Sequence, residues 1–141
     1  MTVTTRRFDA AADVVYASLI DAEAYPKWLV GAKVVHIVDP EWPQPGSSFR
    51  HKVGVGPLEV RDISTVQALG PGRHFHLLVR ARPFLEADVR FDVASDGAGS
   101  VLTMDEKPRG VFRFAAPLMA PLVKARNDKS LQRLADLLET R

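Results

Sequence analysis

The sequence has 141 residues, of which 46% are hydrophobic and 26% are charged, so a disordered or fibrous chain is excluded and one domain over residues 1–141 is expected. It contains no cysteine, which excludes disulfides, thiolate metal sites and thiol nucleophiles. Nineteen basic and 17 acidic residues leave a net charge of +2, which is too small for a dedicated nucleic-acid-binding protein.

The N-terminal part predicts one strand followed by two short helices. Residues 2–8 are β-branched and basic, as in a short strand, and residues 10–20 have the apolar period of a helix that Asp9 would cap. The buried face of that helix is expected to carry Val14, Val15 and Leu19, with Ala11 as a further candidate. Asp21 is expected to begin a second short helix that ends near Trp28.

Residues 33–107 predict a run of antiparallel strands. Segments 73–82 and 86–93 each alternate apolar with charged residues, and a loop of Pro83-Phe84-Leu85 would join them. This register pairs opposite charges on one face and apolar residues on the other: Arg82 with Glu86, Arg80 with Asp88, His76 with Asp92, Val79 with Val89, and Leu77 with Phe91. A slip of one residue would destroy both matches.

The next turn is expected at residues 96–99, closed by Ser95 and Ser100. It pairs further residues in the same sense: Arg90 with Asp105, Asp88 with Lys107, Val93 with Leu102, and Phe91 with Met104. The three strands then share one apolar and one charged face, as in an antiparallel meander that is covered on one side. Ile63 and Leu78 are expected to be exposed on the wet face, so a monomer and a homodimer both stay open.

A helical period returns over residues 114–138. One stripe carries Ala120, Val123, Asn127, Leu131, Leu134 and Leu138. Pro121 fits only a first turn or a kink, so residues 114–120 are candidates for a separate turn. A strand, two helices, a run of strands and a long helix together indicate an α+β fold in which that helix covers the sheet.

Three polar residues are candidates for chemistry at the apolar face. His51 and Asp62 follow the apolar phase of two strands joined around residues 54–57, and a histidine beside a carboxylate can act as a general acid or base. The alternative is a histidine that a neighbour or water satisfies. Glu106 has the apolar phase of its own strand, so it must be paired or titrate upward, and it can bind a ligand hydroxyl or move a proton.

Other polar and aromatic residues leave two interpretations each. Asn127 interrupts an apolar stripe, so its amide either ties the helix to the sheet or reaches a ligand. Trp28 belongs to the core or to a cavity wall, and Trp42 to a surface turn or to a loop over a cavity mouth. The four histidines do not converge and no phosphate-binding glycine loop precedes a helix, so no metal or cofactor is expected.

The chain also has no signal for insertion into a membrane. No apolar run approaches the ~20 residues that cross a bilayer. Residues 1–10 have no apolar core of the kind that signal peptides need. We therefore expect a cytoplasmic protein without integral membrane association or a nucleic-acid partner.

Three segments, in this order and at this spacing, carry a family resemblance. They are residues 11–16 leading to Asp21 and Tyr25-Pro26-x-Trp28, the strand that ends in residues 103–106, and Arg126-Asn127 before the leucines of the last helix. The sequence is similar here to the START/Bet v1-like (SRPBCC) superfamily, and most similar to its polyketide cyclase/dehydrase group. The resemblance implies a helix-grip fold, in which a curved antiparallel sheet wraps around a long C-terminal helix and a deep apolar cavity lies between them.

Members of that superfamily bind lipids, sterols, polyketides or other hydrophobic molecules, and some catalyse cyclisation, aromatisation or dehydration. We therefore predict a hydrophobic ligand in the cavity. The residues expected to contact it are Trp28, Phe49, His51, Val53, Phe75, Leu77, Phe91, Met104, Glu106 and Asn127. One alternative is a cyclase or dehydratase in which His51, with Asp62 or Glu106, transfers a proton. A second alternative is a protein-interaction module without a ligand.

Overall fold

Seven antiparallel strands in the order β1-β7-β6-β5-β4-β3-β2 form one sheet in the computed structural model, which describes residues 2–55, 57–83 and 85–139. The strands are β1 (Thr2–Phe8), β2 (Ala32–Val38), β3 (Ser48–Val55), β4 (Leu58–Gly70), β5 (His74–Ala81), β6 (Leu85–Asp96) and β7 (Gly99–Pro108). The helices of the described residues are α1 (Ala12–Leu19), α2 (Tyr25–Trp28) and α3 (Ala116–Glu139), with 3-10 segments η1 (Ala22–Ala24) and η2 (Gly110–Ala115).

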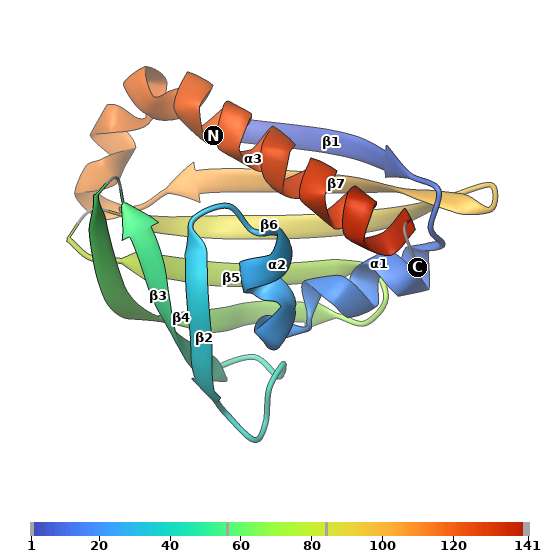
Figure 1. Cartoon of the computed structure of the whole chain (residues 1–141), viewed down its shortest axis with the longest axis horizontal. Coiled ribbons are helices and arrows are strands. Elements are labelled where there is room, and N and C mark those ends of the chain that lie inside the picture. Colours follow the sequence, from blue (N-terminus) through green and yellow to red (C-terminus); the bar gives the residue numbers. More distant parts are fainter. Residues whose placement is uncertain (1, 56, 84, 140–141) are drawn as a thin grey trace.

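The sheet curves around α3, and the short helices after β1 lie beside it (Figure 1). The C-terminal half of α3 closes the core, because Leu131 and Leu134 are wholly buried and pack in one cluster with aromatic residues of the sheet such as Phe91. The predicted α+β helix-grip architecture is therefore confirmed, including the two short helices after the first strand.

The register between β5 and β6 differs from the predicted one by two residues. The observed pairs are His74 with Asp92, Phe75 with Phe91, Leu77 with Val89, Val79 with Ala87, and Arg80 with Glu86. The predicted pairs Arg82–Glu86, Arg80–Asp88, His76–Asp92, Val79–Val89 and Leu77–Phe91 are wrong. A shift of two residues keeps every side chain on its face, so the alternation that excluded a one-residue slip could not exclude this one. Leu85 begins β6 instead of belonging to the loop, and Phe84 lies outside the described residues.

The β6–β7 hairpin has the predicted register, and the predicted β3–β4 hairpin forms. Between β6 and β7, Ser95 lies opposite Ser100, and the pairs Arg90–Asp105, Asp88–Lys107, Val93–Leu102 and Phe91–Met104 all form. Between β3 and β4, His51 lies opposite Asp62. Gly56, one of the residues 54–57 predicted to join these strands, lies outside the described residues.

The first helix corrects two predictions. It begins at Ala12 with Ala11 in the N-cap position, because the chain is still extended at Ala11 (ψ 156°), and Asp9 instead accepts a hydrogen bond from Arg7. Val14 is 40% exposed, whereas Tyr16 is buried beside Val15 and Leu19. The Tyr16 hydroxyl donates to the carbonyl of His74, which fixes the face that α1 presents to the sheet.

Residues 116–120 are part of α3 rather than a separate turn, and Pro121 lies inside the helix. A proline at this position leaves only the carbonyl of Pro117 without its helical partner. Both prolines are exposed, so water can satisfy that carbonyl. The buried residues of α3 begin at Asn127, and none of residues 116–126, all of which the structure describes, is buried.

Leu78 is 3% exposed, so its predicted exposure on the outer face is wrong. It lies on the central strand β5, between Thr65 of β4 and Asp88 of β6, where both neighbouring strands shield it. The outer face of the sheet is therefore not uniformly exposed to water. Ile63, the other residue of that expectation, is half-buried.

Strand β2 forms one edge of the sheet, and its pairing with β3 is irregular. The register shifts once between Ala32 and Val34 and again between His36 and Val38. Both shifts mark bulges or comparable irregularities, which bend an edge strand and increase its local twist.

Replacing a leucine by alanine should destabilise the protein strongly in the C-terminal half of α3 and hardly at all in the N-terminal half. Leu131→Ala should lower the free energy of unfolding by about 2–5 kcal/mol, because it leaves a cavity in the core. Leu122, at 65% exposure, serves as the matched control, and Leu122→Ala should change the same quantity by less than about 0.5 kcal/mol. Urea denaturation followed by circular dichroism measures both. Equal losses in the two variants would contradict the assignment of the buried half.

Candidate functional site

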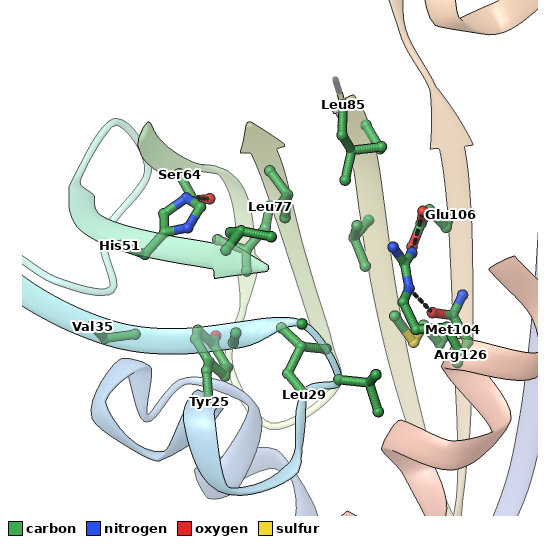
Figure 2. Close-up of a pocket in the computed structure, with 18 of the residues that line it drawn as sticks. Tyr25, Leu29, Val35, His51, Ser64, Leu77, Leu85, Met104, Glu106 and Arg126 are labelled. Carbon is green, nitrogen blue, oxygen red and sulfur yellow. Dashed lines mark hydrogen bonds and ion pairs between the residues drawn. The ribbon is translucent and has the colours of Figure 1, made fainter. Parts of the chain in front are cut away.

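A cavity lies between the inner face of the sheet, the corner from α2 to β2, and α3 (Figure 2). The volume of the cavity that the centre of a water molecule can occupy is about 70 Å³. On that measure a single water needs only about 10–15 Å³, so the cavity is larger than a water site. Its wall is mostly apolar and carries few polar side chains, which is the composition of a small-molecule site.

Most of the residues predicted to contact a ligand line this cavity. They are Phe49, His51, Val53, Leu77, Phe91, Met104, Glu106 and Asn127. Trp28 and Phe75 are wholly buried in the core but are not part of the cavity wall. Trp28 packs edge-on against Tyr25 and Phe91, and so supports two wall residues from behind.

Several residues of the cavity wall are not among the predicted ligand contacts. Those that add polarity or shape are Leu29, Gly31, Ser64, Leu85, Val89 and Arg126. Ser64 has the inward phase of β4, so strand alternation was the signal that would have found it. Arg126 had no such signal, because an arginine on a helix is ordinarily placed in solvent.

His51 forms one polar end of the cavity. The imidazole is 4% exposed, and its Nε2 shares a hydrogen bond of 2.9 Å with Ser64 Oγ. Burial lowers the pKa of His51, and the negative charge of Asp62 offsets this only in part. The ring is therefore neutral at pH 7, with one nitrogen as a donor and the other as an acceptor.

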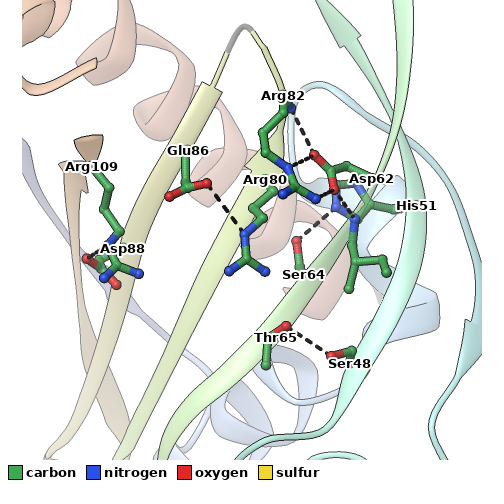
Figure 3. A network of polar contacts seen from close by, with 11 residues as sticks. Ser48, His51, Asp62, Ser64, Thr65, Arg80, Arg82, Glu86, Asp88 and Arg109 are labelled. Atoms are coloured by element: carbon green, nitrogen blue, oxygen red, sulfur yellow. Dashed lines mark hydrogen bonds and ion pairs between the residues drawn. The ribbon is translucent and has the colours of Figure 1, made fainter. Parts of the chain in front are cut away.

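Asp62 does not line the cavity, although it lies opposite His51 in the sheet. Its carboxylate accepts hydrogen bonds from Arg82, through the backbone N–H at 2.9 Å and through Nε and Nη2 at 3.0 and 2.8 Å (Figure 3). Burial raises the pKa of Asp62, but the hydrogen bonds from Arg82 and from the backbone of Ile63 outweigh it and bring the pKa to about 2. The nearest hydrogen-bond partner of His51 is thus a serine and not this carboxylate.

Glu106 and Arg126 form the second polar end (Figure 2). Glu106 is 3% exposed, and Nη2 of Arg126 donates to its two carboxylate oxygens at 2.5 and 2.6 Å. A carboxylate at this depth requires such a partner, because an unpaired buried charge is strongly destabilising. The pair carries no net charge, so it adds polarity to the cavity without selecting for a charged ligand.

Asn127 presents a free donor next to this pair. Its side chain is wholly buried, and its Oδ1 faces Nε of Arg126 at 3.5 Å. Since a guanidinium group only donates hydrogen bonds, the amide must turn its oxygen toward Arg126. Nδ2 then has no partner among the described residues. An unsatisfied buried donor costs about 1–3 kcal/mol, which an acceptor in the cavity would recover.

Trp42 belongs to a packed loop and does not line the cavity. Its ring meets Phe49 and Phe75 edge-on at 5.1 and 5.9 Å, and its Nε1 donates to the carbonyl of Ile20 at 2.7 Å. Within the described residues, no group of three or more histidine, aspartate or glutamate side chains could hold a metal ion. The helices of the same residues include none with the length and hydropathy of a membrane span.

A family described as "Polyketide cyclase / dehydrase and lipid transport" matches residues 2–139 of the chain. No curated protein matches the sequence.

Several solved structures share the fold at low sequence identity. A START superfamily protein from Mycobacterium smegmatis is 20% identical, with a TM-score of 0.68 over 99% of this chain and 94% of that one. Ara h 8.0201 is 11% identical, with a TM-score of 0.77 over 99% and 97%. The di-domain ARO/CYC StfQ from the steffimycin biosynthetic pathway is 15% identical, with a TM-score of 0.76, and the match covers 99% of this chain but 50% of StfQ.

The burial of His51 predicts a pH dependence of stability. Because burial lowers its pKa below the ordinary histidine value of about 6.5, the folded protein binds fewer protons than the unfolded chain, and stability falls as the pH drops below about 6.5. His51→Gln keeps a hydrogen-bonding side chain but does not titrate, so it should lose less stability between about pH 7.5 and 5.5. Urea midpoints at both pH values measure this, with the more exposed His74→Gln as control. Equal slopes for wild type and His51→Gln would contradict it.

Proposed function

The chain belongs to the polyketide cyclase/dehydrase and lipid transport family, and from this premise we propose that it binds a hydrophobic small molecule in the cavity between the sheet and α3. The observation that carries the proposal is the amide of Asn127, a wholly buried donor without a partner at the wall of an otherwise apolar cavity. Such a donor is costly unless something in the cavity accepts its hydrogen bond.

The ligand that fits this cavity has an apolar body and at least one hydrogen-bond acceptor. Phe49, Leu77 and Met104 would contact the body, and each Å² of apolar surface that they bury contributes about 25 cal/mol. Asn127 would donate to the acceptor, and His51 at the other end would bind a second polar group. A lipidic, an aromatic and a polyketide-like molecule all meet this description.

Binding is favoured over catalysis because both candidate carboxylates are already engaged. The carboxylate of Asp62 is held by Arg82, and that of Glu106 by Arg126. A cyclase or dehydratase mechanism would then depend on His51 alone, a neutral imidazole whose bond to Ser64 leaves one ring nitrogen for a substrate.

Filling the cavity should abolish ligand retention. Val89 lies on the wall between Leu77 and Glu106 of the neighbouring strands, and Val89→Phe places a ring in the space the ligand would take. Native mass spectrometry of freshly purified protein should show an added mass on the wild type that this variant lacks. Val101→Phe on β7, which adds the same ring at a position that does not line the cavity, is the matched control and should keep the adduct. A bare wild-type mass, unchanged after incubation with lipids and aromatic polyketides, would contradict ligand binding.

Asn127 should discriminate between ligands that differ only in an acceptor. We expect the protein to bind 2-acetylnaphthalene about tenfold more tightly than 2-ethylnaphthalene, which corresponds to one recovered hydrogen bond of about 1.4 kcal/mol. Asn127→Leu, of similar size but apolar, should abolish this preference while still binding the ethyl compound. Fluorescence titration measures both constants. A preference that survives in Asn127→Leu would assign the donor to another residue.

A further inference from the structure

We propose that the apolar-basic patch, which consists of Phe114, Leu118, Met119 and Leu122 with the neighbouring Arg113, docks the protein on anionic lipid bilayers. The four apolar side chains are exposed by 75%, 81%, 43% and 65% respectively. Four of the eight large hydrophobic side chains recorded as exposed in the described part of the chain thus fall within residues 114–122. A cluster of this kind marks an interaction surface rather than the scattered exposure that is normal for a soluble protein.

The patch spans the end of η2 and the start of α3. Leu118 and Leu122 stand four residues apart on α3, the spacing that aligns side chains on one helix face, and Phe114 lies in η2 just before this helix. The described residues leave Phe114, Leu118 and Leu122 largely uncovered, since each of these side chains is at least 65% exposed. In Figure 1, η2 and the start of α3 (orange) lie at one end of the molecule, near the end of β7.

The charge of the segment selects anionic lipid as the occupant. Residues 107–129 contain six basic residues and one acidic residue, a net charge of +5, so the rest of the chain carries −3 to give the total of +2. Asp88 and Glu106, which lie outside this segment, pair with Arg109 and Arg126, so two of its five net positive charges are neutralised and three remain. Arg113 is within the patch itself and lies over the ring of Phe114 at 4.9 Å. A helix with exposed apolar residues and flanking cations is the combination that lies in the interface of an anionic bilayer.

The patch lies next to the cavity, so docking would bring the cavity close to the bilayer. Arg126 and Asn127, which line the cavity, follow the patch by one turn of α3. A hydrophobic ligand could then pass between the bilayer and the cavity along α3 without crossing bulk water. This transfer rests on the proposed ligand binding, whereas the docking itself does not.

Co-sedimentation with vesicles tests the proposal. The wild type should bind vesicles of phosphatidylcholine with about 30% phosphatidylglycerol, and should bind pure phosphatidylcholine weakly. Raising the salt from about 0.05 to 0.5 M should reduce the bound fraction, because the attraction between cations and headgroups is screened. The double variant Leu118→Ser/Leu122→Ser should reduce binding about tenfold, and Arg113→Gln by a smaller factor. Val14→Ser, also at an exposed apolar position but on α1, is the control and should bind like the wild type.

Three results would overturn the docking. One is no binding to either vesicle, and another is equal binding by the wild type and the double variant. The third is a concentration-dependent dimer that the double variant loses, seen by light scattering without vesicle binding, since a second copy would then be the occupant. Titration of 2-acetylnaphthalene with the same samples separates these failures from a failure of the proposed function, because the patch does not line the cavity.

Discussion

The ion pair between Glu106 and Arg126 joins the sheet to the long helix at the point where that helix leaves the core. On its C-terminal side, α3 buries Asn127 and the leucines that follow. On its N-terminal side, no residue of α3 is buried. A carboxylate that is 3% exposed has to be paired where it lies, so the pair fixes where the wall of the cavity ends and the exposed segment begins.

The two faces of the sheet use charge in different ways. On the outer face, pairs such as Arg80–Glu86, which is half-buried, and His74–Asp92, which is more exposed, cross between neighbouring strands, and contact with water limits what each contributes to stability. On the inner face, polar groups are few and each is surrounded by apolar side chains, where an unmet hydrogen bond is expensive. An unpaired polar group therefore costs more free energy on the inner face than on the outer one.

Side-chain alternation explains which features the sequence could predict. It assigned Phe49, His51 and Met104 to the inner face correctly, and a turn closed by serines fixed the register of β6 with β7. It determined the β5–β6 register only to within two residues, because apolar pairs and charge pairs both recur with that period. Side-chain partners depend on three-dimensional approach, so alternation could not predict that Asp62 turns to Arg82, or that Arg126 reaches into the cavity.

The irregular pairing of β2 bears on whether strands of another molecule can add to this edge of the sheet. A sheet that does not close on itself leaves backbone N–H and C=O groups unpaired along each edge, and a flat edge invites strands of another molecule to add on. Register shifts of the kind seen twice in β2 interrupt the straight geometry that such an addition needs, and Lys33 adds a charged residue to this strand. Both features disfavour edge-to-edge aggregation.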